Sequence, residues 1–199
     1  MAVYTGEWAE AFLRELSLRE ANEPLRAAAV NGNFADWTRL LTAAVVRSCE
    51  SLGWSPAAKG HRSTRLPQAG QEYLGIDVMA FGPADEANAP RWPLPLAVFE
   101  LENQKERAGY SLWKVICVRA SLRVVFAYRN DWAQVRELVR ELAADVLGGL
   151  SVSERLAFGG DLLIVTGSRG EGETFPYGFF KIWRYNANTA SFEKYPGWG

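Results

Sequence analysis

Three acidic residues interrupt apolar segments near the middle of this 199-residue chain. Asp77 lies between Ile76 and Val78, and Glu100 and Glu102 come where an apolar run ends. Acidic side chains are seldom buried unless they are paired or bind a metal ion. The three carboxylates are therefore candidates for a cation site. The alternative is a strand end at which both glutamates are hydrated or paired with a nearby Lys or Arg.

The spacing of the two glutamates places them on one face of a predicted strand. Side chains alternate along a strand, so residues 97, 99 and 101 share one face, and Glu100 and Glu102 share the other. Residues two apart on a strand lie roughly 6–7 Å apart, and like charges at that distance repel in an enclosed site. A raised pKa or a bound cation would relieve the repulsion.

Composition and charge are those of an ordinary globular domain. Hydrophobic residues make up 48% and charged residues 23% of the chain, and the formal net charge is −1. This charge excludes a strongly basic nucleic-acid coat but not local basic patches. The single histidine, His61, disfavours a His-rich zinc site or a Ser-His-Asp triad. Cys49 and Cys117 fit no CxxC pattern, and we expect reduced thiols in a cytoplasmic protein without a secretory signal or membrane span.

The length is sufficient for one sizeable core and too short for two independent ones. We therefore predict a single domain over residues 1–199, with a helical N-terminal part over 1–53 and a mixed sheet with helices over 65–199. Strands followed by crossover helices place the chain in the α/β class.

Helical periodicity predicts three N-terminal helices and two later ones. The third is the clearest, because Asp36 can cap it and Gly53 can end it. The later helices are predicted at residues 110–120 and 131–147. The expected inner face of the helix at 110–120 consists of Tyr110, Trp113, Ile116, Cys117 and Ala120.

Short runs of branched and aromatic residues predict the strands. Residues 72–81 and 94–103 indicate an antiparallel hairpin with a long loop at 82–93, and this pairing would bring Asp77 beside Glu100. Other strands are predicted near residues 65–74, at 122–129, at 161–167 and in a terminal hairpin at 179–195.

Asp77 on one strand, Glu100-Leu101-Glu102 at the end of the next, and Lys114 on the following helix resemble the PD-(D/E)XK, or restriction endonuclease-like, nuclease superfamily. The order helix, three strands, helix, strand is similar to the core of that superfamily. The resemblance covers about residues 36–128 and implies a restriction endonuclease-like mixed sheet flanked by helices, preceded by an N-terminal helical segment.

The resemblance implies metal-dependent hydrolysis of phosphodiester bonds, with DNA favoured over RNA. Asp77, Glu100 and Glu102 are the implied ligands of Mg²⁺ or Mn²⁺, and Glu102 or Lys114 would position the attacking water or take its proton. Glu102 stands where the motif usually has lysine, as in the Glu-x-Glu variant of some restriction enzymes, and Lys114 could replace that lysine from the helix. Glu50 resembles an extra acid that some members carry.

The missing motif lysine and the near-neutral charge leave a second hypothesis open. The chain could be a catalytically inactive nuclease-fold module for binding or assembly, and a homodimer is compatible with either hypothesis. The basic residues before the hairpin are either phosphate contacts or a hydrated loop. They are Lys59, His61, Arg62 and Arg65. Aromatic residues around Lys181 and Arg184 suggest either base stacking or, as the preferred interpretation, core packing of an edge strand.

Overall fold

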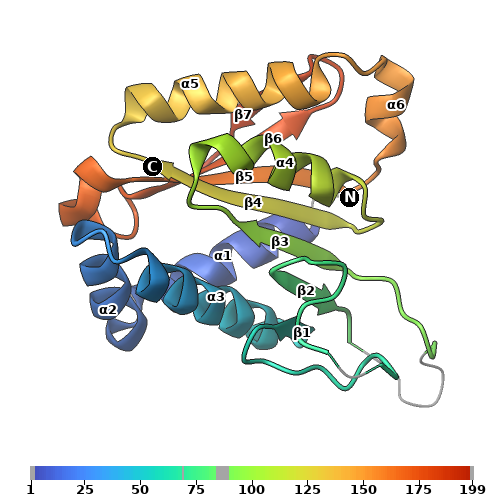
Figure 1. Cartoon of the computed structure of the whole chain (residues 1–199), viewed down its shortest axis with the longest axis horizontal. Helices are drawn as coiled ribbons and strands as arrows, with labels where there is room; N and C mark the ends of the chain where they lie inside the picture. The colour runs from blue at the N-terminus through green and yellow to red at the C-terminus, as the bar shows by residue number, and fades with distance from the viewer. Residues whose placement is uncertain (1–2, 69, 84–89, 198–199) are drawn as a thin grey trace.

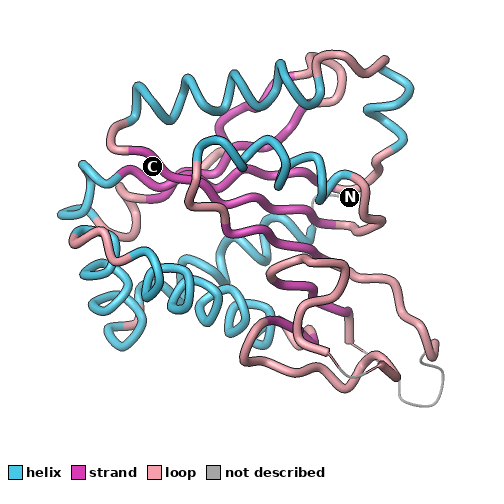
Figure 2. Tube along the Cα trace, viewed as in Figure 1, coloured by secondary structure: helices cyan, strands magenta, loops and turns pink. Residues whose placement is uncertain are grey.

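A mixed seven-stranded sheet lies between two layers of helices in the computed structural model, which describes residues 3–68, 70–83 and 90–197 (Figures 1 and 2). The α/β class and the N-terminal helical segment are thereby confirmed. The helices are α1 (Val3–Ser17), α2 (Arg19–Val30), α3 (Phe34–Ser51), α4 (Lys105–Ile116), α5 (Trp132–Leu142) with its π-helical extension η1 (Ala143–Leu147), α6 (Val152–Ala157) and the 3₁₀ segment η2 (Arg169–Thr174). The strands are β1 (Ser55–Ala58), β2 (Val78–Phe81), β3 (Ala97–Leu101), β4 (Leu122–Arg129), β5 (Asp161–Ser168), β6 (Phe180–Asn186) and β7 (Ser191–Lys194).

The strands lie in the sheet in their chain order. β1, β2 and β3 are antiparallel neighbours, β3, β4 and β5 are parallel, and β6 and β7 complete the sheet as antiparallel strands. α4 connects β3 to β4, and α5 begins the connection from β4 to β5. Such crossovers bring the carboxyl ends of the parallel strands to the same edge of the sheet, which is where α/β proteins commonly bind ligands.

Each face of the sheet has its own hydrophobic core. The face toward α1 and α3 contains Phe99 and Leu101, and it includes stacked rings of Trp8 and Phe12 with centroids 5.3 Å apart. The face toward α4 and α5 contains Val98. The alternation predicted for this strand is confirmed, and it directs the side chain of residue 100 toward α4.

Side-chain capping marks the starts of α3, α5 and α6, with one correction to the sequence prediction. The structure has Asn33, not Asp36, as the N-cap of α3, and the Asn33 side chain accepts a hydrogen bond from the Asp36 amide at 3.3 Å. Either residue type can cap, but α3 begins one turn earlier than its apolar periodicity suggested. Asp131 caps α5 as expected, because its carboxylate accepts from the Gln134 amide at 2.9 Å.

The first strand of the sheet is not where the sequence predicted it. Residues 65–74 form no strand in their described part, and β1 instead follows α3 directly as Ser55–Ala58. β1 carries Pro56, which a sheet tolerates at an edge because proline has no amide hydrogen to donate. The hairpin of β2 and β3 is confirmed, although its strands are shorter than predicted. In the loop predicted at 82–93, residues 84–89 lie outside the described part.

The inner face predicted for α4 is only partly right, since Ile116 and Ala120 contact the core but Tyr110, Trp113 and Cys117 do not. The buried residues of α4 are Ala108, Ser111, Leu112 and Val115, and Cys117 lies exposed after the helix end. Tyr110 and Trp113 are 58% and 52% exposed. Ala108 and Ser111 share the buried face with the larger Leu112 and Val115, and the two large aromatic side chains point outward.

A buried arginine joins the loops at the far end of β4. Arg123 is 2% exposed, and its guanidinium donates hydrogen bonds of 2.8–3.0 Å to three backbone carbonyl oxygens. The acceptors belong to Val118, Phe158 and Gly159. These contacts link the segment before β4 to the segment before β5.

Candidate active site

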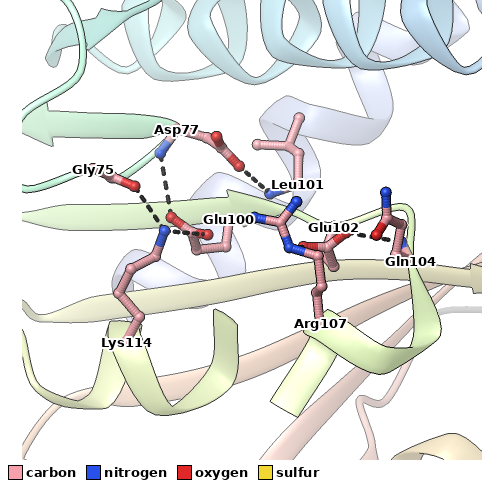
Figure 3. Close-up of polar contacts among 8 residues, drawn as sticks. All are labelled: Gly75, Asp77, Glu100, Leu101, Glu102, Gln104, Arg107 and Lys114. Carbon is pink, nitrogen blue, oxygen red and sulfur yellow. Dashed lines mark hydrogen bonds and ion pairs between the residues drawn. The ribbon is translucent and has the colours of Figure 1, made fainter. Parts of the chain in front are cut away.

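The β2–β3 pairing brings Asp77 and Glu100 together, as the sequence predicted. Val78 pairs with Phe99 in the register of the hairpin, so Asp77 lies beside the end of β3. The Asp77 amide donates to Oε1 of Glu100 at 3.3 Å, and the Leu101 amide donates to Oδ2 of Asp77 at 2.7 Å (Figure 3). The two acids are therefore held by backbone contacts as well as by their strands.

Lys114 reaches the same place from α4 (Figure 3). Its Nζ lies 2.7 Å from Oε2 of Glu100 and donates to the carbonyl oxygen of Gly75 at 2.6 Å. The Glu100 residue is 3% exposed and the Lys114 side chain 20% exposed. Asp77, Glu100 and Lys114 therefore form a compact, largely desolvated group, which we call the acidic pair and its lysine.

Burial dominates the electrostatics of the acidic pair. It raises the pKa of Glu100 to about 7, against the hydrogen bond from Lys114, and the charge of Asp77 adds to the rise. The pKa of Asp77 is also raised, chiefly by burial, although the Leu101 amide opposes the change. Two carboxylates beside one ammonium leave an excess of negative charge in a desolvated place, and a cation would relieve it.

Glu102 lies beyond the end of β3 and has different partners. Its Oε1 accepts a hydrogen bond from the Gln104 amide at 2.8 Å, and its Oε2 lies 3.7 Å from Nε of Arg107 (Figure 3). Across the described residues, no group of three or more His, Cys, Asp or Glu side chains is arranged as a metal site. The structure thus unites Asp77, Glu100 and Lys114, and directs Glu102 toward Arg107.

A cleft of about 630 Å³ opens beside Asp77. It is bounded by α3 on one side and by the segment after β1 on the other. Polar residues of its lining are Thr38, Arg39, Thr42, Lys59, His61, Glu72 and Asp77. Lys59 and His61 belong to the basic stretch noted in the sequence. Arg39 was missed, since a polar residue on the outer face of an amphipathic helix carries no signal of a nearby cleft.

Two other candidate groups have simpler explanations. Glu50 is exposed on α3, and no ion pair among the described residues joins it to the acidic pair. In β6, Phe180 and Ile182 are at most 1% exposed, and Arg184 donates to the Asp161 carboxylate. Core packing of this segment is therefore confirmed, but β6 is not the edge strand that the sequence suggested, because β7 pairs with it on its outer side.

Comparison with protein-family models, with curated proteins and with solved structures finds no match to this chain. None of the helices in the described residues has the length and apolar character needed to cross a membrane. The geometry of the acidic pair and its lysine is therefore the feature of the molecule that points to a function.

Proposed function

We propose that the protein is a metal-dependent nuclease that hydrolyses phosphodiester bonds, with DNA as the favoured substrate. The observation that supports this most directly is the convergence of Asp77, Glu100 and Lys114 at the end of β3. Two acids from neighbouring strands and a lysine from the following helix are the groups that a restriction endonuclease-like site requires.

The order of elements gives further support. α3, β1, β2, β3, α4 and β4 follow one another as helix, three strands, helix and strand. β1 takes the place of the strand expected near 65–74, so the order expected of a restriction endonuclease-like core is retained. We therefore propose this core for residues 34–129, with α1 and α2 before it and the remaining elements after it.

The acidic pair fits a hard divalent cation. Mg²⁺ typically binds one or two protein carboxylates and fills its other positions with water and substrate phosphate oxygens. Asp77 and Glu100 would hold Mg²⁺ or Mn²⁺, and the bound ion would neutralise charge on the phosphate and lower the pKa of a water molecule. Glu102, engaged with Arg107, is proposed as a supporting residue at the rim of the site.

The protein's own groups have distinct tasks in this proposal. Two N–H groups of the Lys114 ammonium donate to Glu100 and to the Gly75 carbonyl oxygen. The third N–H can orient the attacking water or stabilise developing negative charge. Arg39, Lys59 and His61 line the adjacent cleft, where they can neutralise the phosphate backbone of the substrate.

Cleavage of plasmid DNA and of single-stranded DNA in the presence of Mg²⁺ tests the proposal. Asp77→Asn and Glu100→Gln keep the size of each side chain but remove its charge, and we expect each to lower the cleavage rate by about 100-fold or more. Glu10→Gln is the matched control, because Glu10 is an exposed acid of α1, which covers the face of the sheet opposite to α4 and Lys114. Equal residual activity in the wild type, Asp77→Asn and Glu100→Gln would refute the proposal.

A binding or assembly module remains the second candidate, and the orientation of Glu102 favours it. Because Glu102 pairs with Arg107, Asp77 and Glu100 are the two acids left for a metal ion. Glu100 in addition already has Lys114 as its partner. Calorimetric titration with Mn²⁺ separates the candidates. An affinity that Asp77→Asn abolishes supports the nuclease, whereas DNA binding without any metal binding supports the module.

A further inference from the structure

Two aromatic side chains of α4 lie exposed beside the acidic pair. Tyr110 is 58% exposed and Trp113 is 52% exposed, and their ring centroids are 5.8 Å apart. Two large rings that contact each other and also face solvent form an apolar patch. Such patches on a protein surface commonly mark a binding site.

The ring pair is continuous with the proposed site. Lys114 follows Tyr110 by four residues, and its Nζ lies 5.8 Å from the Tyr110 ring centroid while it contacts Glu100. Arg107 precedes Tyr110 by three residues, is 63% exposed at its side chain and pairs with Glu102. Residues three and four apart are neighbours on a helix surface, so a basic residue borders Tyr110 on each side. In Figure 3, Arg107 and Lys114 both extend from α4 toward the end of β3.

A leucine in an unusual conformation lies next to this group. Leu74 has φ of 56°, a left-handed conformation that leucine rarely adopts, and it is 78% exposed. The next residue, Gly75, provides the carbonyl oxygen that accepts the hydrogen bond from Lys114. Backbone strain of this kind occurs most often at functional sites. The hydrogen bond from Lys114 to Gly75 therefore brings the segment that carries the exposed Leu74 side chain to α4.

We infer that Tyr110, Trp113 and Leu74, which we call the α4 ledge, stack unpaired bases of a nucleic-acid strand whose phosphates reach the acidic pair. The inference rests on the proposed nuclease function and narrows its substrate to strands with unpaired bases beside the cleaved bond. Bases in a duplex are stacked on each other and cannot lie on Tyr110. Base–aromatic stacking next to basic residues is the usual way in which proteins hold single strands. Arg107 and Lys114 supply the basic residues.

Oligonucleotide binding without a divalent cation tests the ledge independently of cleavage. The probes are a fluorescent thymidine oligonucleotide of about 12 nucleotides, which remains unpaired, and a duplex of about the same length. Tyr110→Leu and Trp113→Leu are expected to weaken binding of the unpaired probe about 10-fold each, the effect of losing one stacked base, and to leave duplex binding unchanged. Tyr177→Leu is the control, since Tyr177 is 61% exposed and contacts Ser17 of α1, on the other face of the sheet.

The outcomes separate this inference from the proposed function. Equal affinity of the Tyr110→Leu, Trp113→Leu and Tyr177→Leu variants for the unpaired probe overturns the ledge, even if plasmid cleavage still requires Asp77. A loss of duplex binding equal to that of the unpaired probe also overturns it, because a duplex offers no base to stack. If unpaired binding depends on Tyr110 but Mg²⁺ produces no cleavage of either the unpaired probe or the plasmid, the ledge is supported and the nuclease proposal fails.

Discussion

Glu100→Gln removes a carboxyl group whose pKa rises from 4.5 to about 7 in the metal-free fold, chiefly through burial. Between these two pH values the folded protein holds a proton on Glu100 that the unfolded chain has lost. The folded state then binds more protons than the unfolded state, so stability falls as pH rises. Below about pH 4.5 both states are protonated, and above about pH 7 both are ionised, so the change is confined to this window.

The size of the effect follows from the two pKa values. Their difference of roughly 2.5 corresponds to about 3 kcal/mol, at about 1.4 kcal/mol for each pKa unit. The glutamine side chain does not titrate, so the variant lacks this decline. We expect the free energy of unfolding of Glu100→Gln, relative to the wild type, to increase by up to about 3 kcal/mol between about pH 4.5 and about pH 8.

Urea unfolding of both proteins across this pH range measures the difference. Other titrating groups are common to both proteins and largely cancel when the variant is compared with the wild type. Glu10→Gln serves as a control and should parallel the wild type at every pH. Parallel curves for Glu100→Gln and the wild type would refute the reasoning, because they would mean that Glu100 titrates alike in the folded and unfolded chains.

Three further predictions concern single contacts. Lys114→Met removes a cation that lowers the pKa of Glu100, so this pKa should exceed about 7 in an NMR titration of the variant. An unchanged pKa would contradict the ion pair. Arg123→Met leaves three partly buried carbonyl oxygens without their donor and should lower the free energy of unfolding by about 3 kcal/mol in urea. Glu102→Gln should change the calorimetric affinity for Mn²⁺ by less than about threefold, because Glu102 faces Arg107, whereas Asp77→Asn should abolish binding.

The acidic pair could be predicted from the sequence because two local patterns agree. Alternation along residues 97–101 fixes which side chains share a face, and the hairpin order places Asp77 opposite the end of the second strand. The position of Glu102 could not be predicted in this way. Alternation applies only within a strand, and β3 ends at Leu101, so it does not fix the direction of the Glu102 side chain, which lies against Arg107.

The full buried face of α4 and the position of β1 could not be predicted, for different physical reasons. Hydrophobicity alone places Tyr110 and Trp113 in the core, but the face that α4 buries includes the smaller residue Ala108 instead. β1 is a short edge strand that contains Pro56 and lacks branched residues, so it carries no strand signal. The neighbouring strand β2 holds it in the sheet. Tertiary pairing in this case outweighs local preference.

Because Glu100 is buried, metal binding should raise the stability of the fold as well as support activity. In the metal-free protein its carboxylate costs up to about 3 kcal/mol at neutral pH, although an apolar residue at this strand position would incur no such cost. A cation present at about 100 times its dissociation constant would stabilise the fold by about 2.7 kcal/mol, which nearly offsets this cost. A site that is unfavourable when empty and neutral when occupied is typical of a functional constellation.

Thermal unfolding with and without Mg²⁺ therefore gives a last test. We expect Mg²⁺ to raise the melting temperature of the wild type at about pH 8, where Glu100 is ionised, and to have little effect at about pH 4.5, where a proton on Glu100 competes with the metal. Asp77→Asn and Glu100→Gln should lose the rise in melting temperature at about pH 8, and Glu10→Gln should keep it. An equal Mg²⁺ response in all four proteins would place the cation elsewhere on the surface, and the acidic pair would then be a structural feature that destabilises the fold without binding a metal ion.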